Sequence, residues 1–288
     1  MVIVEAIILG IIQGLTEFIP ISSSAHLIII PWLFGWNDPV LTSLTFDVAL
    51  HMGTLLAVLA FFARDWLRLI KAGFASIFEW KIGIDVDRRT AWFLVIATVP
   101  GAIFGMLGES KIDALFHQPG VPIQPIAMIV MAAIIAIFGL ILYLADRLLW
   151  HVREMDQMTF KDTLWIGLAQ ALAIFPGVSR SGSTIMTGLA LGFKREDAAR
   201  FSFLLSAPII AGAGLKSLWE VIGQAHAGLL SGNELLIFPI GFIFAAVSGL
   251  LCIKYLLQYL QKHSLNVFVF YRWALALFIV LLVMLRGF

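Results

Sequence analysis

The feature that most constrains this chain is a set of six long apolar stretches. Each is close to the roughly 20 residues that an α-helix needs to cross the hydrocarbon core of a membrane. The stretches cover residues 43–63, 91–108, 122–147, 199–219, 235–260 and 267–287. In the whole chain, 61% of the residues are hydrophobic and 13% are charged, which leaves too few polar side chains to cover a water-soluble globule. The sequence therefore predicts an all-α integral membrane protein with six spanning helices.

Two further apolar regions are interrupted in the middle by proline and small hydroxyl residues. Residues 2–34 break at FIPISSSAH, and residues 161–192 break at FPGVSRSGST. Each half is too short to span a membrane, and non-helical backbone at that depth must have its polar groups satisfied by protein or water. We therefore predict two re-entrant helical hairpins whose tips meet inside the protein. The first hairpin has no basic segment before it and carries Glu5 and Glu17, so we expect it in the mature fold and not as a cleaved signal peptide.

The two hairpins resemble each other in sequence. Residues 10–26 align without a gap on residues 167–183, with identical glycine, glutamine, leucine, phenylalanine and serine positions. Residues 1–147 then hold the first hairpin and three spans, and residues 157–288 hold the second hairpin and the other three. Because three is an odd number of crossings, the second half starts upside down relative to the first. The sequence predicts two inverted-topology repeats, a plan common in transporters.

Basic residues are distributed unevenly over the connections between these helices. Fifteen of the 19 Lys and Arg residues lie in the connecting segments 64–90, 147–162, 192–200 and 254–272, which we assign to one side. The opposite side has Lys111, Lys216 and Arg286, and Arg180 lies in the second hairpin. The basic side is therefore predicted to be cytoplasmic, with both termini facing outward. The net charge of +1 gives no support to nucleic-acid binding.

Arg180 lies at the tip of the second hairpin, in the segment PGVSRSGST. A charged side chain at membrane depth costs at least ~2.5 kcal/mol and is functional by default. Glycine, hydroxyl and arginine groups at a helix start are suited to binding phosphate. The candidate phosphate-binding residues are Gly177, Ser179, Arg180, Ser181, Gly182 and Thr184. We expect Arg180 to supply the only buried guanidinium; the alternative is a structural pair with a carboxylate such as Glu17.

The first hairpin supplies complementary groups. Gln13 and Glu17 are four residues apart and share one helix face, and the serines at 22–24 and His26 follow in the loop. A carboxylate, hydroxyls and an imidazole are the groups that phosphoryl transfer needs as base, nucleophile and orienting acid. Two alternatives stay open. The serines could cap the returning helix, and His26 could make a satisfied hydrogen bond within the membrane.

A third polar pair, Asp47 and His51, lies early in the first spanning helix. The two residues are also four positions apart and so share a face. They could orient the hairpin loops or help to bind a divalent ion, and a structural pairing is an equally open interpretation.

The motifs GLTEFIPISSSAH and PGVSRSGST together resemble the undecaprenyl-diphosphate phosphatase family, also called bacitracin-resistance proteins. The resemblance extends to FDVALHMGTLLAV at 46–58 and FSFLLSAPIIAG at 201–212, and so covers essentially the whole chain. The residues that match the family's motifs are Gln13, Glu17, Ser22, Ser23, His26 and Arg180. Some relatives have Glu at the position of Gln13. Because this chain has Gln there, Glu17 is the only carboxylate of that motif.

The resemblance implies a phosphatase in the bacterial cytoplasmic membrane that hydrolyses undecaprenyl diphosphate to the monophosphate. This reaction recycles the lipid carrier of peptidoglycan synthesis and gives resistance to bacitracin. Arg180 would hold the terminal phosphate, a loop serine or His26 would attack it, and Glu17 would act as a base or as a ligand of Mg²⁺ or Ca²⁺. We expect the site to open to the outer face. The expected partners are polyprenyl diphosphate and membrane lipids, and a homodimer is possible.

A transporter or flippase of polyprenyl phosphate is the main alternative. Inverted repeats and re-entrant hairpins are the usual architecture of transporters, and such a scaffold could also hold a lipid phosphatase. A purely structural membrane subunit would leave the charges of Arg180 and Glu17 unexplained.

Overall fold

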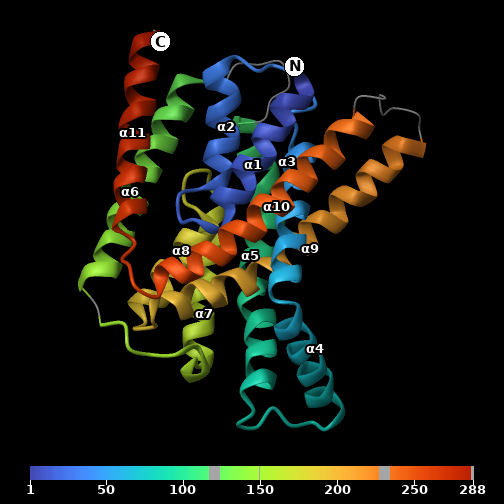
Figure 1. Ribbon diagram of the computed structural model, residues 1–288, viewed down its shortest axis with the longest axis vertical. Helices are drawn as coiled ribbons and strands as arrows, with labels where there is room; N and C mark the ends of the chain where they lie inside the picture. The colour runs from blue at the N-terminus through green and yellow to red at the C-terminus, as the bar shows by residue number, and fades with distance from the viewer. Residues whose placement is uncertain (117–123, 149, 227–233, 287–288) are drawn as a thin grey trace.

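The computed structural model describes residues 1–116, 124–148, 150–226 and 234–286, and these residues form helices without any β-strand (Figure 1). The α-helices are α1 (Val2–Phe18), α2 (Ser23–Phe34), α3 (Leu44–Phe61), α4 (Ala63–Phe78), α5 (Val86–Phe116), α6 (Pro125–Leu148), α7 (Phe160–Ala171), α8 (Arg180–Ala190), α9 (Arg195–His226), α10 (Glu234–Leu260) and α11 (Asn266–Arg286). Two short 3₁₀ helices are η1 (Met155–Gln157) and η2 (Leu172–Ile174).

Six of the described helices are long and apolar enough to cross a membrane. They are α3, α5 over Val86–Gly108, α6, α9 over Arg195–Leu215, α10 over Leu236–Leu260, and α11. The six predicted spans are therefore confirmed, although residues 122, 123 and 287 at their ends lie outside the described residues. The protein is a multi-pass membrane protein. The start of α1 and the end of α11 lie toward the same end of the molecule, and the connection between α4 and α5 lies at the other end (Figure 1).

The two interrupted regions form helical hairpins, α1–α2 and α7–α8. Ser22 precedes α2 and Ser179 precedes α8, and both adopt a positive φ, 77° and 73°, which is uncommon for residues other than glycine. Each serine Oγ accepts a hydrogen bond from a backbone N–H in the first turn of the helix that it caps, from Ala25 or from Gly182. The sequence similarity of the hairpins thus extends to the backbone of their tips.

The tips of the two hairpins contact each other, as predicted. The Gly177 backbone N–H donates to Ser22 Oγ over 3.1 Å, and Ser181 Oγ donates to the Ile19 carbonyl over 3.2 Å. The polar backbone that interrupts each helix is thereby partly satisfied by the other hairpin, as irregular backbone at membrane depth requires.

Helix α1 is fixed on two sides. Its Gly14 faces α10 so closely that an added Cβ would lie 2.0 Å from Ser248 Oγ, which makes this a contact between small residues of the kind common in membrane helix packing. At the end of α1, the ring of Phe18 packs edge-to-face on Phe203 of α9, with centroids 5.2 Å apart. Glu17 is therefore presented by a helix end with little freedom to move.

Helix α4 is the element that the sequence analysis missed, because segment 64–90 was treated as a connection. It carries Arg64, Arg68 and Lys71 along one face and apolar side chains on the other. A search for continuous apolar stretches passes over such an amphipathic helix, since its apolar residues recur only every three or four positions. In Figure 1, α4 lies alongside the first half of α5.

Candidate active site

The carboxylate of Glu17 is the centre of the site and has four side-chain neighbours. Its Oε1 accepts from Arg180 Nη2 over 3.1 Å. Its Oε2 accepts from Ser23 Oγ over 2.6 Å and from Gln13 Nε2 over 3.0 Å, and it lies 3.5 Å from His51 Nε2. These groups come from α1, α2, α3 and α8. The fold thus brings both hairpins and the first spanning helix to one carboxylate.

Arg180 forms a buried ion pair with Glu17, the side chains being 12% and 4% exposed. A second guanidinium nitrogen, Nη1, donates to the Ser202 carbonyl of α9 over 3.2 Å. The third, Nε, is buried and has no hydrogen-bond partner within the described part of the chain. The structural pairing considered for Arg180 is therefore present, and it leaves one strong donor free for an anion.

Ser22 and Ser23 have different roles despite being neighbours. Ser22 Oγ is occupied by the backbone N–H groups of Ala25 and Gly177, so this serine caps a helix and joins the hairpins. Ser23 is half-buried, and its hydroxyl donates to Glu17. A hydroxyl whose proton already points at a carboxylate is an activated nucleophile with its base in place. The geometry therefore favours Ser23 over Ser22 for chemistry.

His26 lies close to the site but faces away from Glu17. Its Nδ1 is 2.6 Å from the Ser22 carbonyl, and its Nε2 is 2.7 Å from the hydroxyl of Tyr271 on α11. Because a carbonyl only accepts, Nδ1 carries the proton, and Nε2 accepts from the tyrosine. Both ring nitrogens are thus hydrogen-bonded. This arrangement agrees with the alternative in which His26 makes a satisfied hydrogen bond within the membrane. Tyr271 belongs to the terminal YRW segment that shares in the family resemblance, but it was not predicted as a site residue.

His51 joins the site, while Asp47 contributes to it through its backbone. His51 Nδ1 donates to the Asp47 carbonyl over 2.7 Å, which orients the ring so that Nε2 faces Glu17. The predicted third polar pair therefore meets the first hairpin through the imidazole of His51.

The other predicted phosphate-binding residues build the loop that presents Arg180. Ser179 caps α8 through the Gly182 N–H, and Ser181 bonds to the first hairpin. Thr184 Oγ1 lies 2.6 Å from Ser202 Oγ of α9. The Gly177 N–H is already bonded to Ser22. In this arrangement, Arg180 supplies the free donor, and its neighbours hold it in place.

Arg272 of α11 is a second buried guanidinium, which corrects two expectations. It was counted with the exposed cytoplasmic connection 254–272, and Arg180 was expected to be the only buried guanidinium. Instead, Arg272 is 1% exposed and donates to the carbonyls of Pro20 and Gly177 over 3.1 and 2.8 Å. It also donates to Val178 and to Ile135 of α6. The sequence feature that could have indicated a buried Arg272 is its position inside the predicted span 267–287, where a charge is functional by default.

A metal ion has few protein ligands available at this site. Within the described residues there is no group of three His, Cys, Asp or Glu side chains that could hold one. Beside Glu17, however, the Oε1 atom of Gln13 is buried without a hydrogen-bond partner in that same part of the chain. Mg²⁺ is commonly held by one or two carboxylates together with substrate phosphates. Gln13 and Glu17 therefore fit a divalent cation whose remaining ligands come from a bound diphosphate or water.

The fold and the site define an integral membrane protein in which two hairpins bring a serine, a carboxylate and a guanidinium together, as phosphoryl transfer requires. The chain belongs to the bacitracin resistance protein BacA family, whose sequence model matches residues 6–278. The predicted family is thus confirmed.

Relatives cover nearly the whole chain. An undecaprenyl-diphosphatase of Moorella thermoacetica is 46% identical over 286 residues, which is 99% of this chain and 100% of the relative. One of Desulforudis audaxviator is 45% identical over 283 residues, 98% of each chain. One of Methanobrevibacter smithii is 41% identical over 284 residues, 96% of each chain.

Proposed function

We propose that this chain is a membrane phosphatase that hydrolyses undecaprenyl diphosphate to undecaprenyl phosphate and inorganic phosphate. The observation that carries the proposal is the 2.6 Å hydrogen bond from Ser23 to Glu17, whose other oxygen pairs with Arg180. The names of the relatives, at 41–46% identity over nearly the whole chain, support it. The reaction would recycle the lipid carrier of peptidoglycan synthesis and give resistance to bacitracin.

The residues suggest a two-step reaction. The free Nε–H of Arg180 binds the terminal phosphate, and Ser23 Oγ attacks its phosphorus while Glu17 takes the serine proton. The bond to the bridging oxygen breaks, and undecaprenyl phosphate leaves with the bond's electron pair. Water then hydrolyses the phosphoserine, and the proton held by Glu17 returns to the Ser23 oxygen. In this proposal His26 positions Ser22 and does not react.

A divalent cation, Mg²⁺ or Ca²⁺, is an optional part of the proposal. Gln13 and Glu17 would hold it together with the diphosphate oxygens, and it would neutralise the negative charge that develops on the diphosphate. With or without the cation, Ser23 attacks the terminal phosphate and Arg180 orients it.

The proposal predicts that the purified protein in detergent releases phosphate from undecaprenyl diphosphate. Ser23→Ala should abolish release, whereas Ser24→Ala is the matched control and should keep most of it, because the Ser24 hydroxyl hydrogen-bonds to the Ser22 hydroxyl and the Ser23 hydroxyl to Glu17. Acid quench of the wild type with a labelled terminal phosphate should trap an acid-stable phosphoserine.

Other results of the same experiment would support other interpretations. An adduct that is labile to acid and stable to base would be a phosphohistidine and would assign the attack to His26. Release of phosphate without any adduct would favour direct attack by water. Lipid movement across vesicles with no release of phosphate would support the polyprenyl-phosphate transporter.

We further propose that the two hairpins belong to inverted repeats over 1–147 and 157–288 and that the site opens to the outer face of the cytoplasmic membrane. The matching serine caps at 22 and 179 support the repeat. The excess of basic residues on the cytoplasmic connections supports the orientation, with Arg272 no longer counted among them. Both hairpins come from one chain, so a homodimer is compatible with this site but is not needed to complete it.

The outward opening predicts a specific labelling pattern in a Cys252→Ser background. Ser24→Cys, at the half-buried hairpin tip, should react with a membrane-impermeant thiol reagent added to intact spheroplasts and should be protected by a diphosphate analogue. Lys81→Cys, in the exposed α4–α5 connection, is the control and should react only in inside-out vesicles. The reverse pattern would contradict the orientation.

A further inference from the structure

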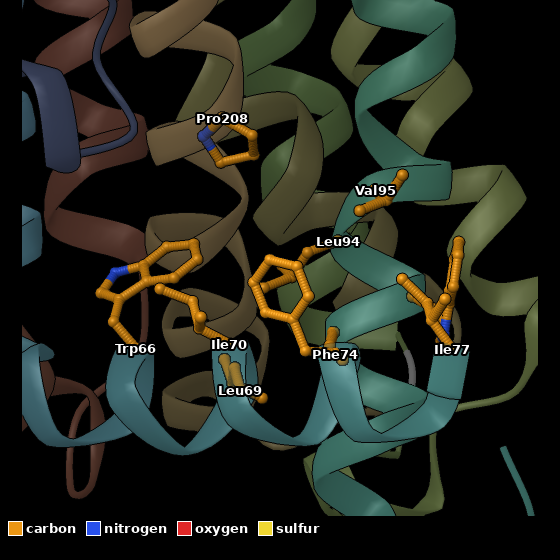
Figure 2. A pocket seen from close by; sticks show the side chains of 11 residues that line it. Trp66, Leu69, Ile70, Phe74, Ile77, Leu94, Val95 and Pro208 are labelled. Carbon is orange, nitrogen blue, oxygen red and sulfur yellow. The ribbon is translucent and has the colours of Figure 1, made fainter. Parts of the chain in front are cut away.

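An apolar groove lies between α4, α5 and α9, outside the site described above. Its volume is about 260 Å³, and residues of all three helices line it. In Figure 2, Trp66, Ile70 and Phe74 extend from α4 toward the space between α5 and Pro208 of α9. The lining contains no Asp, Glu, Lys, Arg or His side chain. We refer to this feature as the α4–α5 groove.

The apolar face of α4 is only partly covered by the rest of the described chain. Leu69 is buried, but Ile70, Phe74 and Ile77 remain 50, 59 and 50% exposed. The opposite face of the same helix carries Arg64, Arg68 and Lys71. The basic side chains can reach water or lipid head groups while the apolar face stays against α5 and hydrocarbon. An exposed apolar face of this kind favours a hydrocarbon occupant for the groove.

The wall contributed by α5 belongs to a helix that is long and apolar enough to cross a membrane. Ala91, Leu94 and Val95 line the groove, and all three lie in the first half of the span Val86–Gly108. An occupant of the groove must be apolar, since the lining offers no charge to hold a polar ligand. Under the proposed orientation, this half of α5 is the cytoplasmic half.

Helix α9 links the groove to the candidate active site. Pro208 forms one edge of the groove, and Ser202, whose carbonyl holds Arg180, lies six residues earlier on the same helix. At a rise of 1.5 Å per residue, the two positions are about 9 Å apart along the helix axis. This separation is short compared with a long apolar chain whose phosphate lies at Arg180.

We propose that the α4–α5 groove binds the polyprenyl chain of the substrate and so selects for long-chain diphosphates. This proposal rests on the proposed function. Aromatic and branched walls such as Trp66, Ile70 and Phe74 suit a methyl-branched chain, and the chain of an undecaprenyl lipid is long enough to extend past the site.

Filling the groove tests the proposal. An added Cβ at Gly73 would lie 3.5 Å from the Ala91 Cβ, an ordinary contact, so a larger side chain there fits the helix and enters the groove. Gly73→Leu is expected to raise KM for undecaprenyl diphosphate about fivefold or more by removing apolar contact area. It should change turnover of geranyl diphosphate, whose short chain does not fill the groove, by less than about twofold. Gly105→Leu is the matched control, because a Cβ on Gly105 of α5 meets nothing within 4 Å.

The other outcomes of this experiment overturn the proposal. Equal loss with both substrates would make the groove structural, and no change with either would place the chain elsewhere. If Gly73→Leu does not fold, the wild type can be irradiated with an undecaprenyl diphosphate analogue that carries a diazirine near the end of its chain. Adducts are expected within 66–77 or 91–95, whereas adducts elsewhere, or crosslinks between two copies, would contradict the proposal. Crosslinking measures binding of the chain without turnover. A failure of the proposed phosphatase function would therefore be distinguishable from a failure of the groove proposal.

Discussion

Arg180→Ala is expected to lower phosphate release by about 1000-fold, because a single donor aimed at a developing charge contributes that much in buried sites. The variant loses the buried Nε–H that has no partner among the described residues, and it loses the counter-ion of Glu17. Removing one partner of a buried ion pair destabilises a protein by about 3–5 kcal/mol, so its melting temperature should fall as well. Activity and thermal stability should be measured on the same detergent preparation.

Two companion variants separate the phosphate role of Arg180 from its structural role. Arg180→Lys keeps the charge beside Glu17 but lacks the planar fork that reaches Glu17, Ser202 and an anion together. It should be nearly as stable as the wild type and remain at least tenfold slower. The double variant Glu17→Gln/Arg180→Ala should regain stability without activity. Near-normal turnover of Arg180→Lys would reduce Arg180 to a counter-ion.

The six spanning helices and the two hairpins could be predicted from the sequence because they follow from local composition. The spans and the hairpin breaks are read from apolar length and from proline and serine positions, and the tip contacts follow from the need to satisfy interrupted backbone. The pairing of Glu17 with Arg180 was considered only as the alternative to phosphate binding, although each buried charge needs a partner.

Side-chain direction could not be predicted in this way. The sequence places His26 next to the reactive serines, but the ring turns toward Tyr271, a residue 245 positions away. His51 was left as an undecided pair with Asp47, and only the packing of α3 against α1 brings its ring to Glu17. The direction of each side chain depends on which helices become neighbours. A single sequence without a structure does not contain this information.

Arg272 is expected to act on both hairpins at once, because it holds their backbones together. Its partners in the described part of the chain are the carbonyls of Pro20, Gly177, Val178 and Ile135. The carbonyls of the first hairpin, the second hairpin and α6 thus converge on one buried guanidinium. Carbonyl oxygens without a donor at this depth would each cost free energy.

Arg272→Lys should therefore lower stability and activity together. An ammonium has three donors on one atom and cannot reach carbonyls that surround a guanidinium from several sides, so we expect a loss of about 3 kcal/mol or more in the free energy of unfolding. Phosphate release should fall at least tenfold because the tips that carry Ser23 and Arg180 lose their common anchor. Thermal unfolding distinguishes this variant from Arg180→Lys, which should keep its stability. A stable but inactive Arg272→Lys would show that Arg272 contacts the phosphate instead of the hairpin backbones.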